Sequence, residues 1–309
     1  MMVFRRKYAW KQLIFILIGL FFVWYLVFKQ HDYEVRFKAK TSPGTLYTMV
    51  EEWNLIRKQQ GKHDYELLSK TPYDVIFQKI EYGGSEYELE WRFESLNDSI
   101  TEVTMGYYQP GRKVYNRLTA PFLKTKFKED LLFFANEYKT GLDFTLKEKF
   151  RVHSVNLDTI PEMSYAYLQL KGIPGRDKAA NMMKNNSYLL QILQELNLKK
   201  KGYPFLFIEN WDKQNNILDF RFCYQIEPTL RLPAHVELKY DIAEARPALK
   251  AIYNGNYIYS DRGWFALYEY AKRHKIDCEQ TPLEIFHNNP FSESNEIKWI
   301  TEIYLPLKD

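Results

Sequence analysis

The spacing of hydrophobic residues changes several times along the chain, and each change marks an expected element. Residues 13–28 form a nearly unbroken apolar run, which is typical of a helix in an apolar environment. Residues 33–40 alternate between apolar and polar positions, which predicts a strand. Leu46, Val50 and Trp53 then follow at helical spacing, after a serine and a proline suited to begin a helix.

The next alternating segments predict β-hairpins. The expected strands are 73–82, 86–94 and 100–108, separated by the turns Gly83-Gly84 and Asn97-Asp98. The middle strand carries large apolar side chains on one face and charged side chains on the other, so one face is expected to meet a core and the other water.

The sequence predicts a loop before these hairpins and a long helix after them. The polar stretch 57–70 shows neither the helical nor the alternating spacing of hydrophobic residues, and it is predicted to be a loop. Thr125 is placed to cap a long helix with an apolar stripe, which is predicted to end at Gly141. Because the inward side chains of the middle strand are so large, we expect them to fill the space against this stripe rather than leave it open.

Residues 165–305 show the same order of elements twice. Each copy has a strand ending at a glycine, a helix, a strand beginning near a proline and a final alternating strand; the copies occupy 165–226 and 249–305. A strand-helix-strand-strand unit cannot bury its apolar face alone, so we expect two copies to pair side by side. The copies differ at one position, where Leu206 in the first is matched by Glu284 in the second.

Composition narrows the classes of function. Aromatic residues make up 17% of the chain and include 24 tyrosines, which suit ligand cavities as well as thick cores. The net charge of +4 is small for 309 residues, so no nucleic-acid partner is expected. The histidines show no metal-ligand spacing, and neither a metal nor a cofactor is predicted. The sequence leaves open whether Cys223 and Cys278 pair.

The N-terminal segment, residues 1–32, predicts a membrane anchor. A basic cluster at 5–11 precedes the apolar run 13–28, and no small-residue cleavage site follows it. This pattern favours an uncleaved signal anchor over a cleaved signal peptide. It predicts a single pass through the inner membrane, with residues 1–12 in the cytoplasm and 33–309 outside it.

Two motifs in the following segment suggest its fold. They are Thr41-Ser42-Pro43 followed by Leu46 and Val50, and Pro121-Phe122 followed by Phe127 and Leu131. They resemble the start of the first helix and the approach to the last helix in START-like, polyketide-cyclase-like domains. The resemblance implies a helix-grip domain at 33–145, in which an antiparallel sheet wraps around the last helix.

The duplicated half carries four motifs with a consistent order and spacing. They are Tyr253-Asn254-Gly255-Asn256-Tyr257, Gly263-Trp264-Phe265-Ala266-Leu267-Tyr268, Pro282-Leu283-Glu284-Ile285-Phe286 and Thr301-Glu302-Ile303-Tyr304-Leu305-Pro306. They resemble GyrI-like small-molecule-binding domains, which also occur as effector-binding modules of bacterial transcription activators. The resemblance implies a domain at 150–309 with an aromatic groove between the paired units. It also implies that Glu284 faces this groove and recognises cationic aromatic ligands.

The candidate ligand-binding residues are Glu284, Tyr257, Trp264, Tyr304 and Tyr224. Tyr257 follows an Asn-Gly pair and is expected to project into the groove, whereas Trp264 lies at core spacing on its helix, where packing is the more usual role. Tyr304 and Tyr224 lie on equivalent strands, and periodicity does not decide which strand face meets the groove. Glu284 has a second interpretation as a solvent-exposed strand residue. No catalytic residue is assigned.

These patterns predict an α+β protein with one transmembrane helix, a helix-grip domain and a duplicated GyrI-like domain. The leading hypothesis is a membrane-anchored protein that binds a hydrophobic or cationic small molecule through an aromatic groove and the carboxylate of Glu284. A second hypothesis is a hydrolase in which Glu284 acts as general base on a water molecule and Tyr257 orients the substrate. A third is an envelope interaction protein whose grooves are closed.

Overall fold

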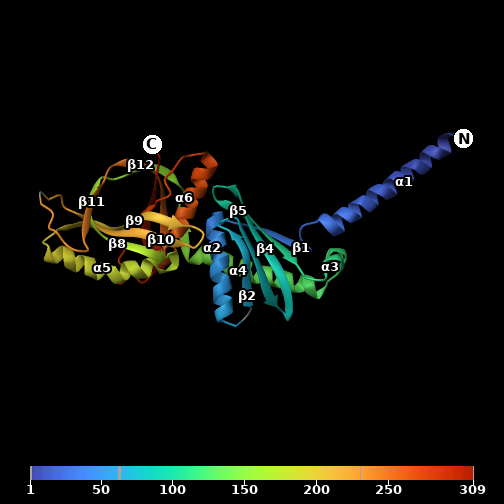
Figure 1. Ribbon diagram of the computed structural model, residues 1–309, viewed down its shortest axis with the longest axis horizontal. Coiled ribbons are helices and arrows are strands. Elements are labelled where there is room, and N and C mark those ends of the chain that lie inside the picture. The colour runs from blue at the N-terminus through green and yellow to red at the C-terminus, as the bar shows by residue number, and fades with distance from the viewer. Residues whose placement is uncertain (1, 62–63, 230, 309) are drawn as a thin grey trace. The chain divides into compact units, whose positions relative to one another are not determined.

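The chain folds into two compact units, each with its own antiparallel sheet and helices (Figure 1). This computed structural model describes residues 2–61, 64–229 and 231–308. Unit 1 comprises Met1–Lys38, Met49–Phe93 and Glu102–Thr140, and unit 2 comprises Ala39–Thr48, Glu94–Thr101 and Gly141–Asp309. The predicted α+β class is confirmed in this general form.

The first sheet has the strand order β1-β5-β4-β3-β2. Its strands are β1 (Tyr33–Ala39), β2 (Asp64–Thr71), β3 (Val75–Tyr82), β4 (Ser85–Asn97) and β5 (Ile100–Tyr108). The accompanying helices are α2 (Pro43–Gln59), α3 (Lys113–Thr119) and α4 (Lys126–Glu148). The predicted hairpin strands are therefore present, and α2 begins at the predicted proline.

Two expectations for this region are wrong. The stretch 57–70 is mostly regular structure where it is described, because α2 continues to Gln59 and β2, from Asp64 onward, pairs with β3; residues 62–63 lie outside the described residues. β2 lies at the sheet edge with most of its side chains exposed, so burial imposes no alternation on its sequence. Gly141 does not end α4, because the buried Leu142 continues the apolar stripe, and one glycine costs a helix only about 1 kcal/mol.

Aromatic side chains fill the interior of unit 1. Trp91 on β4 is fully buried, and its ring centroid lies 4.6 Å from that of Tyr138 on α4. Phe134, one turn earlier on α4, packs edge-on against Tyr82 of β3 at 5.5 Å. These contacts confirm that strand and helix face each other, and they agree with a filled core.

The N-terminal α1 (Met2–Val23) ends within the apolar run and continues as a π-helical turn, Trp24–Phe28. Among the helices that the structure describes, none combines the length and the apolar character needed to cross a bilayer. The transmembrane span expected at 13–28 is therefore not supported. The location expected for residues 33–309 stays a prediction.

Arg117 on α3 fixes the chain that follows α1. Its side chain is buried, and its Nε donates to Asp32 Oδ1 at 3.0 Å. Its Nη1 donates to the backbone oxygen of Leu26 at 2.9 Å, while the hydroxyl of Tyr25 donates to the backbone oxygen of Arg117 at 3.0 Å. Since both charged groups are buried, neither tolerates loss of the other.

The sheet of unit 2 has the order β11-β8-β10-β9-β13-β14-β12-β6, with β7 also paired to β12. The first copy consists of β8 (Met163–Pro174), α5 (Lys178–Glu195), β9 (Lys200–Asp212) and β10 (Ile217–Ile226). The second consists of β12 (Arg246–Gly255), α6 (Asp261–His274), β13 (Leu283–Phe286) and β14 (Ile300–Pro306). The flanking strands are β6 (Phe150–Val152), β7 (Asn156–Ile160) and β11 (Lys239–Ala243).

The sheet order reflects the duplication. The first copy reads β8-β10-β9 across the sheet, and the second reads β13-β14-β12, so the two copies are joined at β9 and β13. At this junction Glu284 lies directly opposite Leu206, its counterpart in the other copy. Equivalent positions can be direct neighbours only near an axis that relates the copies, so the two differing residues mark the centre of the domain.

We predict that Arg117→Met destabilises unit 1 by about 3–5 kcal/mol, because it leaves the Asp32 carboxylate buried without its counter-charge. Urea unfolding followed by tryptophan fluorescence measures this change. Lys124→Met, at an exposed position nearby in the sequence, serves as control and should change the free energy of unfolding by less than about 0.5 kcal/mol. A loss below about 1 kcal/mol for Arg117→Met would contradict the role given to this pair.

Candidate functional site

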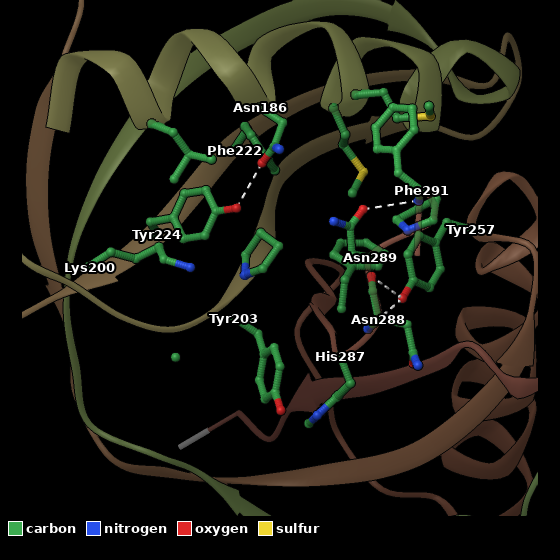
Figure 2. Close-up of a pocket in the computed structure, with 17 residues that line it drawn as sticks. Asn186, Lys200, Tyr203, Phe222, Tyr224, Tyr257, His287, Asn288, Asn289 and Phe291 are labelled. Atoms are coloured by element: carbon green, nitrogen blue, oxygen red, sulfur yellow. Dashed lines mark hydrogen bonds between the residues drawn. The ribbon is translucent and has the colours of Figure 1, made fainter. Parts of the chain in front are cut away.

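A cavity of about 350 Å³ opens in unit 2 between α5, the start of β9 and the loop that follows β13 (Figure 2). Its apolar lining residues are Met182, Met183, Leu190, Pro204, Phe222, Phe286, Pro290 and Phe291. Its polar lining residues are Asn186, Lys200, Tyr203, Tyr224, Tyr257, His287, Asn288 and Asn289, with Gly202 completing the wall. An apolar cavity of this size with a few convergent polar groups is typical of a small-molecule site.

Tyr257 forms one wall of the cavity and holds the neighbouring loop. It lies in the 3₁₀ turn Tyr257–Tyr259, which begins at Asn256, whose side chain accepts from the backbone N–H of Ile258. The hydroxyl of Tyr257 donates to the backbone oxygen of Asn288 at 3.0 Å and accepts from its backbone N–H at 2.9 Å. Burial raises the pKa of Tyr257 to about 12, further above physiological pH than the ordinary value for a phenol.

Tyr224 on β10 forms the opposite wall, as Figure 2 shows. Its hydroxyl donates to Oδ1 of Asn186 on α5 at 2.8 Å, which fixes the ring against the helix. The Nζ atom of Lys200 lies 5.1 Å from the ring centroid, within the range of a cation–π contact. Burial raises the pKa of Tyr224 to about 12 as well.

The electrostatic character of the cavity is neutral to positive. Lys200 supplies a cationic group, and the ring of His287 lies 4.5 Å from that of Tyr203. No aspartate or glutamate is among the described residues that line the cavity. A ligand with a positive charge would therefore find no counter-charge in this wall.

Glu284 is fully buried and paired with a lysine. Lys178 Nζ donates to both carboxylate oxygens, at 2.8 and 2.7 Å, and to Ser260 Oγ at 2.7 Å. The indole Nε1 of Trp264 donates to the same carboxylate at 2.7 Å. Lys178 Nζ also lies 4.4 Å from the centroid of the Trp264 ring. Both charges are thus compensated inside the protein.

These elements match a known family over half of the chain. Residues 153–308 match the family described as the GyrI-like small molecule binding domain. The chain belongs to the GyrI-like family.

Several solved structures are similar to parts of this chain. No curated protein matches the sequence. Among solved structures, the C-terminal domain of EcmrR is 14% identical with a TM-score of 0.44, covering 50% of this chain and 98% of that one. SAV2435 bound to tetraphenylphosphonium is 12% identical with a TM-score of 0.35, covering 50% and 94%. The di-domain ARO/CYC StfQ is 12% identical with a TM-score of 0.27, covering 89% and 85%. TM-scores this low carry no argument on function.

The GyrI-like domain brings together only part of the expected site. Tyr257 and Tyr224 line the cavity. Tyr304 lies on the other face of the sheet, in a cluster with Tyr165, and its hydroxyl donates to Glu302 at 2.8 Å. Trp264 is 1% exposed and belongs to the core under the helices. Neither Trp264 nor Tyr304 is among the described residues of the cavity wall.

The expected free carboxylate is also absent from this wall, because Glu284 is held by Lys178 from the other copy. Sequence reasoning missed Lys178. It is the first residue of α5, one helical turn before the buried Met182, so it falls on the apolar stripe of its helix. A lysine on the apolar stripe of a helix is unusual, and so is a glutamate on a strand where the other copy has leucine. Together these two residues are the sequence signal for a buried ion pair between the copies.

The GyrI-like domain should lose stability when either charge of this pair is removed. If Glu284 were buried without a partner, replacing its carboxylate with an amide would stabilise the domain. Because Glu284→Gln instead leaves the Lys178 ammonium without its counter-charge, we expect the free energy of unfolding to fall by about 3–5 kcal/mol. The double variant Lys178→Met/Glu284→Leu removes both charges and should recover most of this loss. Urea unfolding of Lys178→Met, Glu284→Leu and the double variant, with the exposed Glu162→Gln as control, measures the coupling. Additive losses would refute it.

Proposed function

We propose that the GyrI-like domain binds a small aromatic or amphipathic molecule, neutral or negatively charged, in the cavity between α5 and β13. The observation that carries this proposal is the cavity itself, about 350 Å³ in volume and lined by aromatic and methionine side chains. Tyrosine hydroxyls and asparagine amides at the wall supply directional hydrogen bonds, while the methionines adapt to ligand shape. The family assignment supports small-molecule binding in general.

The arrangement around Glu284 supports some of the hypotheses from the sequence less than others. Recognition of a cation by Glu284 is not favoured, because this carboxylate already has a lysine partner. Hydrolysis with Glu284 as general base is not favoured either, since three donated hydrogen bonds occupy its oxygens. The cavity favours ligand binding over an interaction protein with closed grooves. For unit 1 we keep the helix-grip fold as a proposal, supported by a sheet that packs against α4.

The first prediction for this site concerns its volume. Met183 lines the cavity and is half exposed, so Met183→Trp should fill part of the space with little effect on stability. Binding of the neutral dye N-phenyl-1-naphthylamine, followed by its fluorescence, should weaken at least about tenfold, or 1.4 kcal/mol. Leu157→Trp, on an exposed strand position elsewhere in unit 2, is the matched control. Equal effects of the two substitutions, or no dye binding by the parent protein, would refute the proposal.

The second prediction concerns charge at the cavity mouth. Lys200→Gln should weaken binding of the anionic dye 1-anilinonaphthalene-8-sulfonate about two- to fivefold, the range for an exposed charge contact. Binding of N-phenyl-1-naphthylamine should not change. Lys201→Gln is the matched control, because Lys201 is also exposed but does not line the cavity. Similar losses for both dyes would show that Lys200 acts through shape rather than charge.

A further inference from the structure

The ammonium group of Lys178 has the surroundings of a bound cationic ligand. A carboxylate accepts from it through both oxygens, a serine hydroxyl accepts at 2.7 Å and an indole ring faces it at 4.4 Å. A carboxylate together with an aromatic face is the usual means by which proteins bind organic ammonium ions. Lys178 is 1% exposed, so bulk solvent does not reach its ammonium group.

The lysine and the groups around it come from different copies. Lys178 begins α5 of the first copy, whereas Ser260, Trp264 and Glu284 all belong to the second. The second copy therefore forms a complete receptor for an ammonium ion, and the first copy inserts a lysine into it. Leu206, opposite Glu284, shows that the first copy has no equivalent carboxylate.

This receptor borders the proposed ligand cavity. Met182, one turn beyond Lys178, and Phe286, two residues beyond Glu284, both line the cavity wall. Ser260 Oγ donates to the backbone oxygen of Tyr257, a third wall residue, at 3.0 Å. A cation in the cavity would thus approach a carboxylate whose charge is already compensated.

We propose that Lys178 is a resident cation, which occupies the ammonium-binding position of the domain and so excludes positively charged ligands from it. The claim about ligand charge rests on the proposed function, whereas the claim that a cation receptor exists does not. Lys178 is accordingly a specificity-determining residue. Its removal should expose a site for small primary ammonium ions that the parent protein does not offer.

Chemical rescue tests the receptor directly. Lys178→Ala removes three methylene groups and an ammonium, which together correspond to n-propylammonium. This ion, at ten times its dissociation constant, should raise the folded-to-unfolded ratio of Lys178→Ala about 11-fold. Potassium chloride at equal ionic strength should not, and neither the parent protein nor Lys178→Ala/Glu284→Leu should respond to n-propylammonium. If Lys178→Ala is unfolded alone, recovery of its native circular dichroism is the readout.

An equal response of the double variant, or no recovery of Lys178→Ala with n-propylammonium, would overturn the receptor. Ligand charge is tested on the folded parent protein with N-phenyl-1-naphthylamine, 1-anilinonaphthalene-8-sulfonate and the cationic dye thioflavin T. The first two should bind at least about tenfold more tightly than the third, and Lys178→Met should narrow this gap. Equal binding of thioflavin T by the parent would overturn the exclusion. Failure of all dyes to bind would refute the proposed function while leaving the rescue result intact.

Discussion

The buried ion pair between Lys178 and Glu284 is the interaction on which the C-terminal domain depends. Each charge comes from a different copy of the repeat, and both lie where β9 and β13 join the copies into one sheet. A single buried charge costs several kcal/mol, whereas a well-coordinated pair offsets most of that cost. The pair therefore makes each copy depend on the other in a way that apolar contacts alone would not.

The same pair explains the character of the neighbouring cavity. The carboxylate of Glu284 accepts hydrogen bonds from Lys178 and Trp264, and Lys178 also donates to Ser260. The negative charge of Glu284 is therefore compensated within the domain. What remains is a space bounded by Tyr224 and Tyr257, two neutral phenols whose pKa is raised to about 12 by burial. Under the proposed function, selection of a ligand there would depend on shape, hydrogen bonding and the positive charge of Lys200.

Unit 1 also contains a buried ion pair, but there it connects two segments of the chain. The buried pair of Arg117 and Asp32 ties the chain after α1 to α3. Its interior is closed by large aromatic contacts, such as that between Trp91 and Tyr138. Such ring contacts pack strand β4 closely against α4.

The sequence by itself determined much of the fold. Alternation of apolar and polar residues predicted the hairpins between residues 73 and 108, and the repeated order of elements predicted two paired units. Both predictions were possible because the spacing of hydrophobic residues and the positions of turn residues reflect local exposure directly. It failed at β2, where an edge strand has no buried face, and at Gly141, where a helix tolerates one glycine. The sequence also singled out Glu284 and Tyr257. Only the tertiary structure decided what Glu284 does, because its partner lies 106 positions away and is brought to it by the order in which the strands join. The local sequence pattern does not contain that order, so the pairing of two distant buried charges is a property of the folded sheet.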